Sequence, residues 1–73
     1  MNNLLNIINT VLKNRNKTPL DKIDEDTRLR EDLGFDSLDL AELTVRIEAE
    51  YDIDIFEEGI VNTIHEVKLK LNI

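Results

Sequence analysis

Apolar residues recur three and four positions apart in three separate stretches of the chain, and this spacing gives a helix one apolar face. The stretches contain, in chain order, Leu4, Leu5, Ile8, Val11 and Leu12, then Leu40, Leu43, Ile47 and Tyr51, and finally Ile64, Val67 and Leu71. Ile53 and Ile55 alternate with acidic residues as in a strand, but no second alternating segment exists to pair with them. The pattern therefore predicts an all-α fold.

Residues that start and stop helices bound these stretches. The first helix is expected to begin behind Asn2 or Asn3 and to end at 14–17. The last helix should open at the capping-box sequence 63–66, Thr-Ile-His-Glu. Phe-Glu-Glu-Gly at 56–59 predicts a single helical turn that stops at the glycine. We therefore expect four helical segments, of which the third is very short.

The segment from Arg15 to Asp36 shows no sustained periodicity, and loops of this length are uncommon and usually functional. A simple connector would not need five large apolar side chains, yet this segment contains Leu20, Ile23, Leu29, Leu33 and Phe35. We expect these side chains to pin the loop to the core and to fasten the approach to Ser37.

Ser37 is placed to enter the first turn of the second helix, which should run to about Tyr51. Asp36 can act as the N-cap, and Asp39 lies three residues further on, as in a capping box. A serine nucleophile needs a base, but the chain has one histidine, His65, and no cysteine. A Ser-His-Asp enzyme is therefore not expected. For an isolated Asp-Ser pair, a simple helix cap is the ordinary interpretation.

Length and charge exclude several classes of function. Seventy-three residues make one small domain, 1–73, which can bury only about 60% of its unfolded surface and has no room for a deep catalytic cleft. The net charge of −7 repels nucleic acid and anionic membranes and attracts proteins with basic patches. No apolar run approaches the ~20 residues needed to span a bilayer, and the first residues resemble neither a signal nor a transit peptide. We expect a cytoplasmic protein.

The second helix has more than one kind of exposed face. Its polar stripe is expected to contain Asp39, Glu42, Arg46 and Glu50. A further apolar stripe of Leu38, Ala41 and Val45 begins beside Ser37, and either it packs under the loop or it forms a docking surface for a partner. We also expect Asp36, Asp39 and Glu42 to place three full negative charges at the helix N-terminus, which outweigh its positive dipole and disfavour free phosphate.

The segment 32–39, Asp-Leu-Gly-Phe-Asp-Ser-Leu-Asp, followed by Glu42-Leu43 and later by Glu48, resembles the attachment segment of acyl carrier proteins. The resemblance extends over nearly all 73 residues. It implies a discrete carrier of the bacterial type, folded as a small antiparallel four-helix bundle with a long loop between the first two helices. It also implies that Ser37 receives 4'-phosphopantetheine from coenzyme A and that the protein carries acyl groups as thioesters without being an enzyme.

The same resemblance implies the partners and the surface that they contact. The partners would be a phosphopantetheinyl transferase and acyl-loading, condensing and acyltransferase enzymes with basic patches. The matching positions are Asp36, Leu38, Asp39, Glu42, Val45 and Glu48. Asp36 would also help to place the transferase's Mg²⁺. The carrier itself is expected to be a monomer without a metal site of its own, because its acidic clusters do not fit the calcium-loop pattern.

The pathway is left open by the sequence. Phe56 stands where housekeeping fatty acid carriers often have proline, the segment 55–63 is short, and Arg46 interrupts the acidic stripe. These departures favour a specialised acyl or polyketide-type pathway, but fatty acid synthesis remains an alternative. An aminoacyl or peptidyl carrier is a second hypothesis. A third is a helical interaction domain that is never modified and in which Ser37 only caps a helix.

Overall fold

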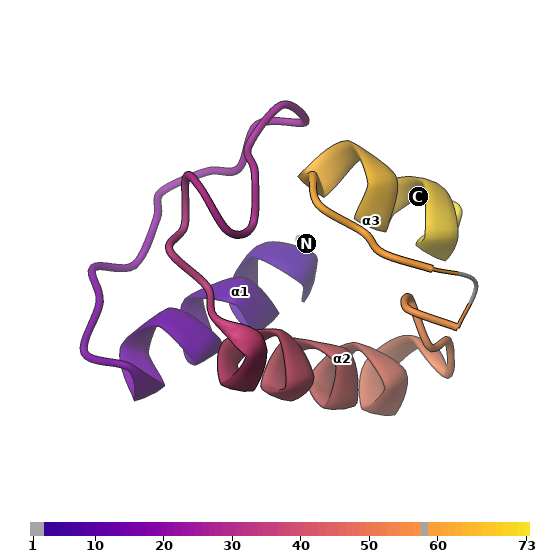
Figure 1. Cartoon of the computed structure of the whole chain (residues 1–73), viewed down its shortest axis with the longest axis horizontal. Coiled ribbons are helices and arrows are strands. Elements are labelled where there is room, and N and C mark those ends of the chain that lie inside the picture. Colours follow the sequence, from indigo (N-terminus) through magenta and orange to yellow (C-terminus); the bar gives the residue numbers. More distant parts are fainter. Residues whose placement is uncertain (1–2, 58) are drawn as a thin grey trace.

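Three α-helices make up the regular structure of residues 3–57 and 59–73, the part of the chain that the computed structural model describes (Figure 1). They are α1 (Asn3–Asn14), α2 (Ser37–Tyr51) and α3 (Ile64–Leu71). No strand occurs in these described ranges, where β pairing is limited to an isolated bridge between Arg28 and Thr63. The all-α prediction is confirmed.

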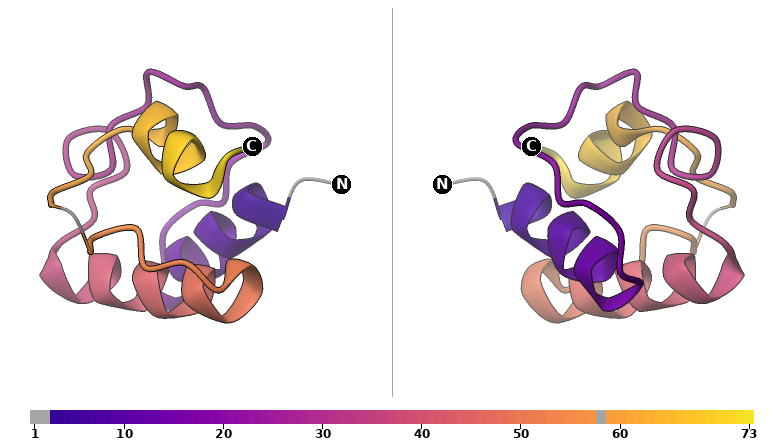
Figure 2. Two further views of the ribbon diagram at one scale, coloured as in Figure 1. Left: turned by 90° about the vertical axis from the view of Figure 1, so that its right-hand side faces the viewer. Right: turned by 90° about the vertical axis from the view of Figure 1, so that its left-hand side faces the viewer.

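The helices α1 and α2 run in opposite directions, and α3 lies above α2 in Figure 1 and in both views of Figure 2. The long loop between α1 and α2 rises to the start of α3 before it descends to α2. Three backbone hydrogen bonds join the loop to the start of α3: the amides of Ile64 and His65 donate to the carbonyls of Thr27 and Glu25, and the Leu29 amide donates to the carbonyl of Asn62.

The apolar faces of the three helices meet in one core, as their spacing predicted. The buried helical residues are Leu4, Ile8, Val11 and Leu12 of α1, Leu40, Leu43 and Ile47 of α2, and Ile64, Val67 and Leu71 of α3. Tyr51 is half-buried against this core. Burial of these aliphatic side chains is the main favourable contribution to folding, because each one removes apolar surface from water.

Loop residues complete the core and fix the path toward α2. Leu29, Leu33 and Phe35 are buried, while Leu20 and Ile23 are half-buried against the same core. The amide of Phe35 donates to the carbonyl of Leu29 across 3.0 Å, which closes the chain into a tight turn just before α2. The prediction that the loop is pinned by its apolar side chains is confirmed.

The expected helical turn at 56–59 is a pair of hydrogen-bonded turns and not a helix in the residues described there; Glu58 lies outside them. The Asp54 carboxylate accepts a hydrogen bond from the Phe56 amide (3.0 Å), and such a side-chain bond competes with helix formation. Gly59 then adopts a φ of +139°, so the chain does not continue as a right-handed helix beyond the predicted stop. The four-helix part of the prediction is therefore not confirmed. The predicted cap for α1 at Asn2 also lies outside the described residues, in which α1 begins at Asn3.

Candidate functional site

Ser37 is the first residue of α2 and is exposed, with a complete capping box around it. The Asp36 carboxylate accepts a hydrogen bond from the Asp39 amide, and the Asp39 carboxylate accepts one from the Asp36 amide, both across 3.0 Å. This reciprocal pair satisfies two backbone amides that a helix start would otherwise leave without partners. The predicted cap and the predicted position of Ser37 are both confirmed.

Gly34 and Phe35 direct the chain into this helix start. Gly34 has a φ of +72°, a conformation that residues with a Cβ atom adopt only with strain. Its carbonyl accepts a 2.6 Å hydrogen bond from the Lys17 Nζ atom, and the Phe35 ring is buried beneath, with the same Nζ 5.9 Å from the ring centroid. The turn before Asp36 is thus held by the Lys17 hydrogen bond to Gly34 and by the burial of Phe35.

The Ser37 hydroxyl makes no hydrogen bond within the described residues. His65, which could have acted as a base, instead places its Nδ1 atom 3.2 Å from Glu25, at the surface near the start of α3. Without a base, the hydroxyl has no activation from its own chain. The geometry therefore favours a serine that another protein activates and modifies over a catalytic serine that its own chain activates.

Asp39 does not lie on the exposed polar stripe, so the sequence-based prediction is wrong on this point. Its side chain is only 1% exposed, while that of Asp36 is 56% exposed. The reason is its place in the capping box: to reach the Asp36 amide, the carboxylate turns inward toward α1 and the loop. Asp39 therefore offers no surface to a partner.

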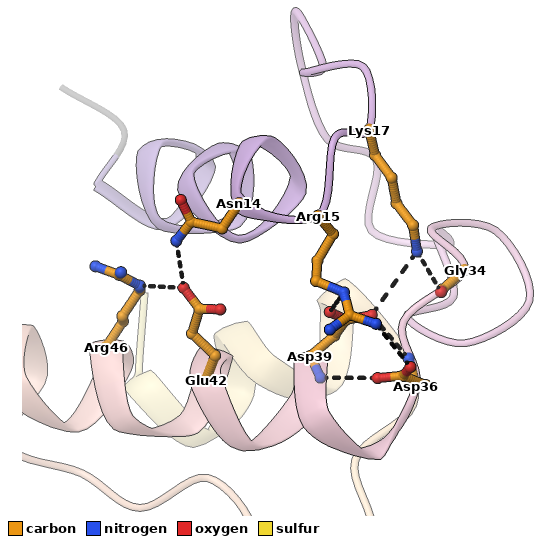
Figure 3. A network of polar contacts seen from close by, with 8 residues as sticks. All are labelled: Asn14, Arg15, Lys17, Gly34, Asp36, Asp39, Glu42 and Arg46. Atoms are coloured by element: carbon orange, nitrogen blue, oxygen red, sulfur yellow. Dashed lines mark hydrogen bonds and ion pairs between the residues drawn. The ribbon is translucent and has the colours of Figure 1, made fainter.

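Two cations that the sequence-based reasoning missed, Arg15 and Lys17, surround these carboxylates (Figure 3). The Arg15 guanidinium lies 3.1 Å from an Asp36 oxygen and 2.9 Å from Asp39 Oδ1, and Lys17 Nζ lies 3.7 Å from Asp39 Oδ2. The three negative charges expected at the start of α2 are therefore partly offset by two cations that the prediction did not include. The sequence analysis treated the run 14–17, Asn-Arg-Asn-Lys, only as the end of the first helix. Its two positive charges, directly after α1, were the signal that cations could pair with these carboxylates.

Glu42 is also paired, one turn further along α2. Its Oε2 atom accepts hydrogen bonds from Asn14 Nδ2 (2.7 Å) and Arg46 Nε (2.8 Å), and these donors, Arg46 most strongly, lower the pKa of Glu42. The pKa of Asp36 is lowered mainly by the hydrogen bond from the Asp39 amide, with a further contribution from Arg15. Internal donors thus favour the charged form of the exposed Asp36 and of the half-buried Glu42.

The third stripe of α2 is open to solvent. Leu38 and Val45 are 69% and 67% exposed, and Ala41 and Glu48 are exposed beside them. Of the two alternatives that the sequence left open, packing under the loop is excluded by this exposure. An apolar pair flanked by acidic residues is a surface suited to a partner that has both basic and apolar groups.

A surface pocket of about 270 Å³ opens next to Ser37 on the side of α2 that faces the segment after Tyr51. Ser37 and Arg30 line it together with the apolar side chains of Leu40, Phe56, Ile60 and Val61. A mostly apolar hollow with few polar groups is typical of small-ligand sites. A group attached to Ser37 would therefore begin at the edge of this pocket.

Within 3–57 and 59–73, no group of three or more histidine, cysteine, aspartate or glutamate residues is arranged to hold a metal ion. In the same ranges no helix has both the length and the apolar character needed to cross a membrane.

Comparisons with known proteins agree with this geometry. Residues 2–66 match the family model described as "Phosphopantetheine attachment site". The mitochondrial acyl carrier protein of Saccharomyces cerevisiae is 42% identical over 52 residues, which are 71% of this chain and 42% of the yeast protein. The matched region thus spans less than half of that relative. No solved structure matches significantly.

Proposed function

Because this chain belongs to the acyl carrier protein family, whose members carry covalently attached 4'-phosphopantetheine, we propose that Ser37 is the residue that bears this group. The observation that carries the proposal is the hydroxyl of the exposed Ser37, which has no hydrogen-bond partner in the described residues and sits at a capped helix start. Ser37 is also the only serine of the chain.

The surroundings of Ser37 fit such a group. The flanking carboxylates are held by their own capping box and by Arg15. The adjacent pocket is open and mostly apolar, which suits acyl cargo at the end of a flexible arm. When bound, the group supplies a terminal thiol that holds acyl chains as thioesters.

In the loading reaction, Ser37 Oγ would attack the phosphate of coenzyme A that bears the pantetheine. A phosphodiester forms at Oγ, the adenosine bisphosphate leaves, and a base of the transferase takes the serine proton, because this chain has none nearby. Asp36 would contribute its charge to the transferase's Mg²⁺. The chain is a substrate in this reaction and performs no catalysis of its own.

The docking surface follows from the exposed part of α2. Asp36, Leu38, Glu42, Val45 and Glu48 would contact basic and apolar groups of the transferase and of the acyl-loading, condensing and acyltransferase enzymes. Asp39 is left out of this surface because it is buried. Partner binding through surface charges should weaken as ionic strength rises.

The proposed cargo is an acyl group, which the yeast relative's name, an acyl carrier protein, supports, and fatty acid synthesis as its pathway stays a prediction. A specialised acyl pathway, favoured by Phe56 and Arg46, stays a prediction, as do the monomeric state and the cytoplasmic location. The yeast protein is named as mitochondrial.

The test is to incubate the purified chain with coenzyme A, Mg²⁺ and a broad-specificity phosphopantetheinyl transferase and to follow the intact mass. Wild type should gain one phosphopantetheine and Ser37→Ala should gain none. Thr44→Ala, which removes another hydroxyl beside the same pocket, is the matched control and should be modified normally. A folded wild-type chain that stays unmodified with two transferases of different specificity would contradict the proposal.

A further inference from the structure

Arg15 bridges the two carboxylates that flank Ser37 in the sequence. Its Nη2 atom lies 3.1 Å from Asp36 Oδ2 and its Nε atom lies 2.9 Å from Asp39 Oδ1 (Figure 3). Arg15 comes directly after α1, and its amide still bonds to the Leu12 carbonyl. One side chain therefore ties the end of α1 to the first turn of α2, more than twenty residues further along the chain.

The contact with Asp39 carries more weight than the contact with Asp36, because the two carboxylates differ in burial. Asp36 is more than half exposed, so water can solvate its charge. Asp39 is 1% exposed, and its Oδ1 atom is buried without accepting any hydrogen bond. The Arg15 guanidinium, close to Oδ1 but not in hydrogen-bond geometry, is therefore the main compensation for that oxygen.

Lys17 is a second and less direct support. Its Nζ atom is 3.7 Å from Asp39 Oδ2, but its 2.6 Å hydrogen bond goes to the Gly34 carbonyl. Asp39 Oδ2 meanwhile accepts the hydrogen bond from the Asp36 amide, which fixes the residue just before Ser37. A shift of the Asp39 carboxylate would therefore be transmitted to the backbone on both sides of Ser37.

We propose that Arg15 is a positioning residue for the modification of Ser37: by holding the buried carboxylate of Asp39, it keeps the capping box closed and the serine in the first turn of α2. The proposal rests on Ser37 being the attachment residue. It assigns to the segment after α1 a role in presenting the site, although no hydrogen bond joins this segment to the Ser37 side chain in the described residues.

The experiment compares Arg15→Gln, Arg15→Lys, Asp39→Asn and the double variant Arg15→Gln/Asp39→Asn. The first readout is amide hydrogen exchange of Asp36 and Asp39 in the unmodified chain, because these two amides donate the capping-box hydrogen bonds. The second is kcat and KM for transfer of phosphopantetheine. Arg46→Gln is the matched control, since Arg46 pairs with Glu42 and has no contact with the capping box.

We expect Arg15→Gln to lower the protection of these amides and kcat/KM by about tenfold, because a buried acceptor loses its main compensation. Arg15→Lys should restore part of both, and Arg46→Gln should leave amide protection within about twofold of wild type. In the Asp39→Asn background the Arg15→Gln change should have little further effect, because a neutral amide needs no counter-charge.

Additive effects of Arg15→Gln and Asp39→Asn, or wild-type protection and rates in Arg15→Gln, would overturn the proposal. If Arg15→Gln does not fold, Arg15→Lys takes its place. The coupling is then measured by comparing Arg15→Lys, Asp39→Asn and the double variant Arg15→Lys/Asp39→Asn. Failure of the wild-type chain to accept phosphopantetheine would contradict the function of Ser37, while amide exchange would still report on the Arg15–Asp39 contact.

Discussion

The structure contains two complete capping boxes, one at the start of α2 and one at the start of α3, and they are held in different ways. At α3, Glu66 accepts hydrogen bonds from the Asn62 and Thr63 amides and from the Thr63 hydroxyl, which are all neutral neighbours in the sequence. At α2, the corresponding carboxylate, Asp39, is buried and compensated by cations from the loop after α1. The carboxylate of the α3 box thus has only local donors, although backbone hydrogen bonds join the start of α3 to the loop. The carboxylate of the α2 box instead depends on side chains from a distant part of the chain.

The difference has a functional consequence, because the box at α2 encloses the exposed Ser37. A local cap can fray and reform on its own, as helix ends commonly do. A cap that also needs Arg15 and Lys17 forms together with the packing of α1 and the loop. Ser37 is thus presented by the whole fold and not by a short peptide motif alone.

The largest effect should come from Asp39→Ala. This change removes the capping contact, leaves the Asp36 amide without its acceptor and takes one of two carboxylates from Arg15, so the free energy of unfolding should fall by about 2–3 kcal/mol. Urea denaturation followed by circular dichroism measures it. A loss no greater than that of Thr63→Ala would remove the distinction between the two boxes.

Thr63→Ala should have a smaller effect, about 1 kcal/mol, because it deletes a local N-cap with neutral donors. The loss should be nearly the same at low and high salt, since no ion pair is broken. Thr63→Ser retains the hydroxyl and serves as the control. A strong salt dependence of the Thr63→Ala loss would show that charges also hold the box at α3.

Acid should weaken both boxes. The pKa of Asp36 is lowered chiefly by the Asp39 amide, and that of Glu66 by the Asn62 amide, from ordinary values of 3.8 and 4.5. A lowered pKa in the folded state stabilises the fold above the ordinary value, and this stability is lost as the pH falls through the folded-state pKa. The melting temperature should therefore not fall between pH 7 and about 5, because repulsion among the acidic residues also decreases there. It should decline below about pH 4.5. In Glu66→Gln the decline should be shallower, and an unchanged decline would exclude Glu66 as a contributor.

The smallest effect is expected for Arg46→Gln. This residue forms an exposed i,i+4 pair with Glu42, and such pairs contribute about 0.3–0.5 kcal/mol. A double-mutant cycle with Glu42→Gln would measure the coupling. A value above about 1 kcal/mol would indicate that the Glu42 cluster, like the box at α2, is part of the tertiary framework.

The local features of the fold could be predicted from the sequence because they depend on neighbouring residues. Helix periodicity, both capping boxes and the exposed Ser37 all follow from spacings of three or four residues. The failed prediction of a helical turn near Phe56 also has a local cause, since Asp54 bonds to the backbone in competition with the helix.

The charge state of the site could not be predicted in the same way. Nothing in the spacing of Asp36 and Asp39 shows that the second turns inward, nor that Arg15 and Lys17 reach them from the other end of a long loop. Such contacts depend on the path of the loop, which Phe35 and Leu29 fix only in the folded chain. Two acidic residues that look alike in the sequence therefore have different roles, one exposed and one buried.

The most direct test of the account is to locate the modification within the chain. Trypsin cleavage after Arg30 and Arg46 releases the peptide 31–46, which contains only two hydroxyl side chains, Ser37 and Thr44. After treatment with coenzyme A and transferase, fragment masses of this peptide should place one phosphopantetheine on Ser37. A group found on any other residue, or a peptide 31–46 that remains unmodified while the intact chain gains mass, would contradict the assignment of Ser37 as the attachment site.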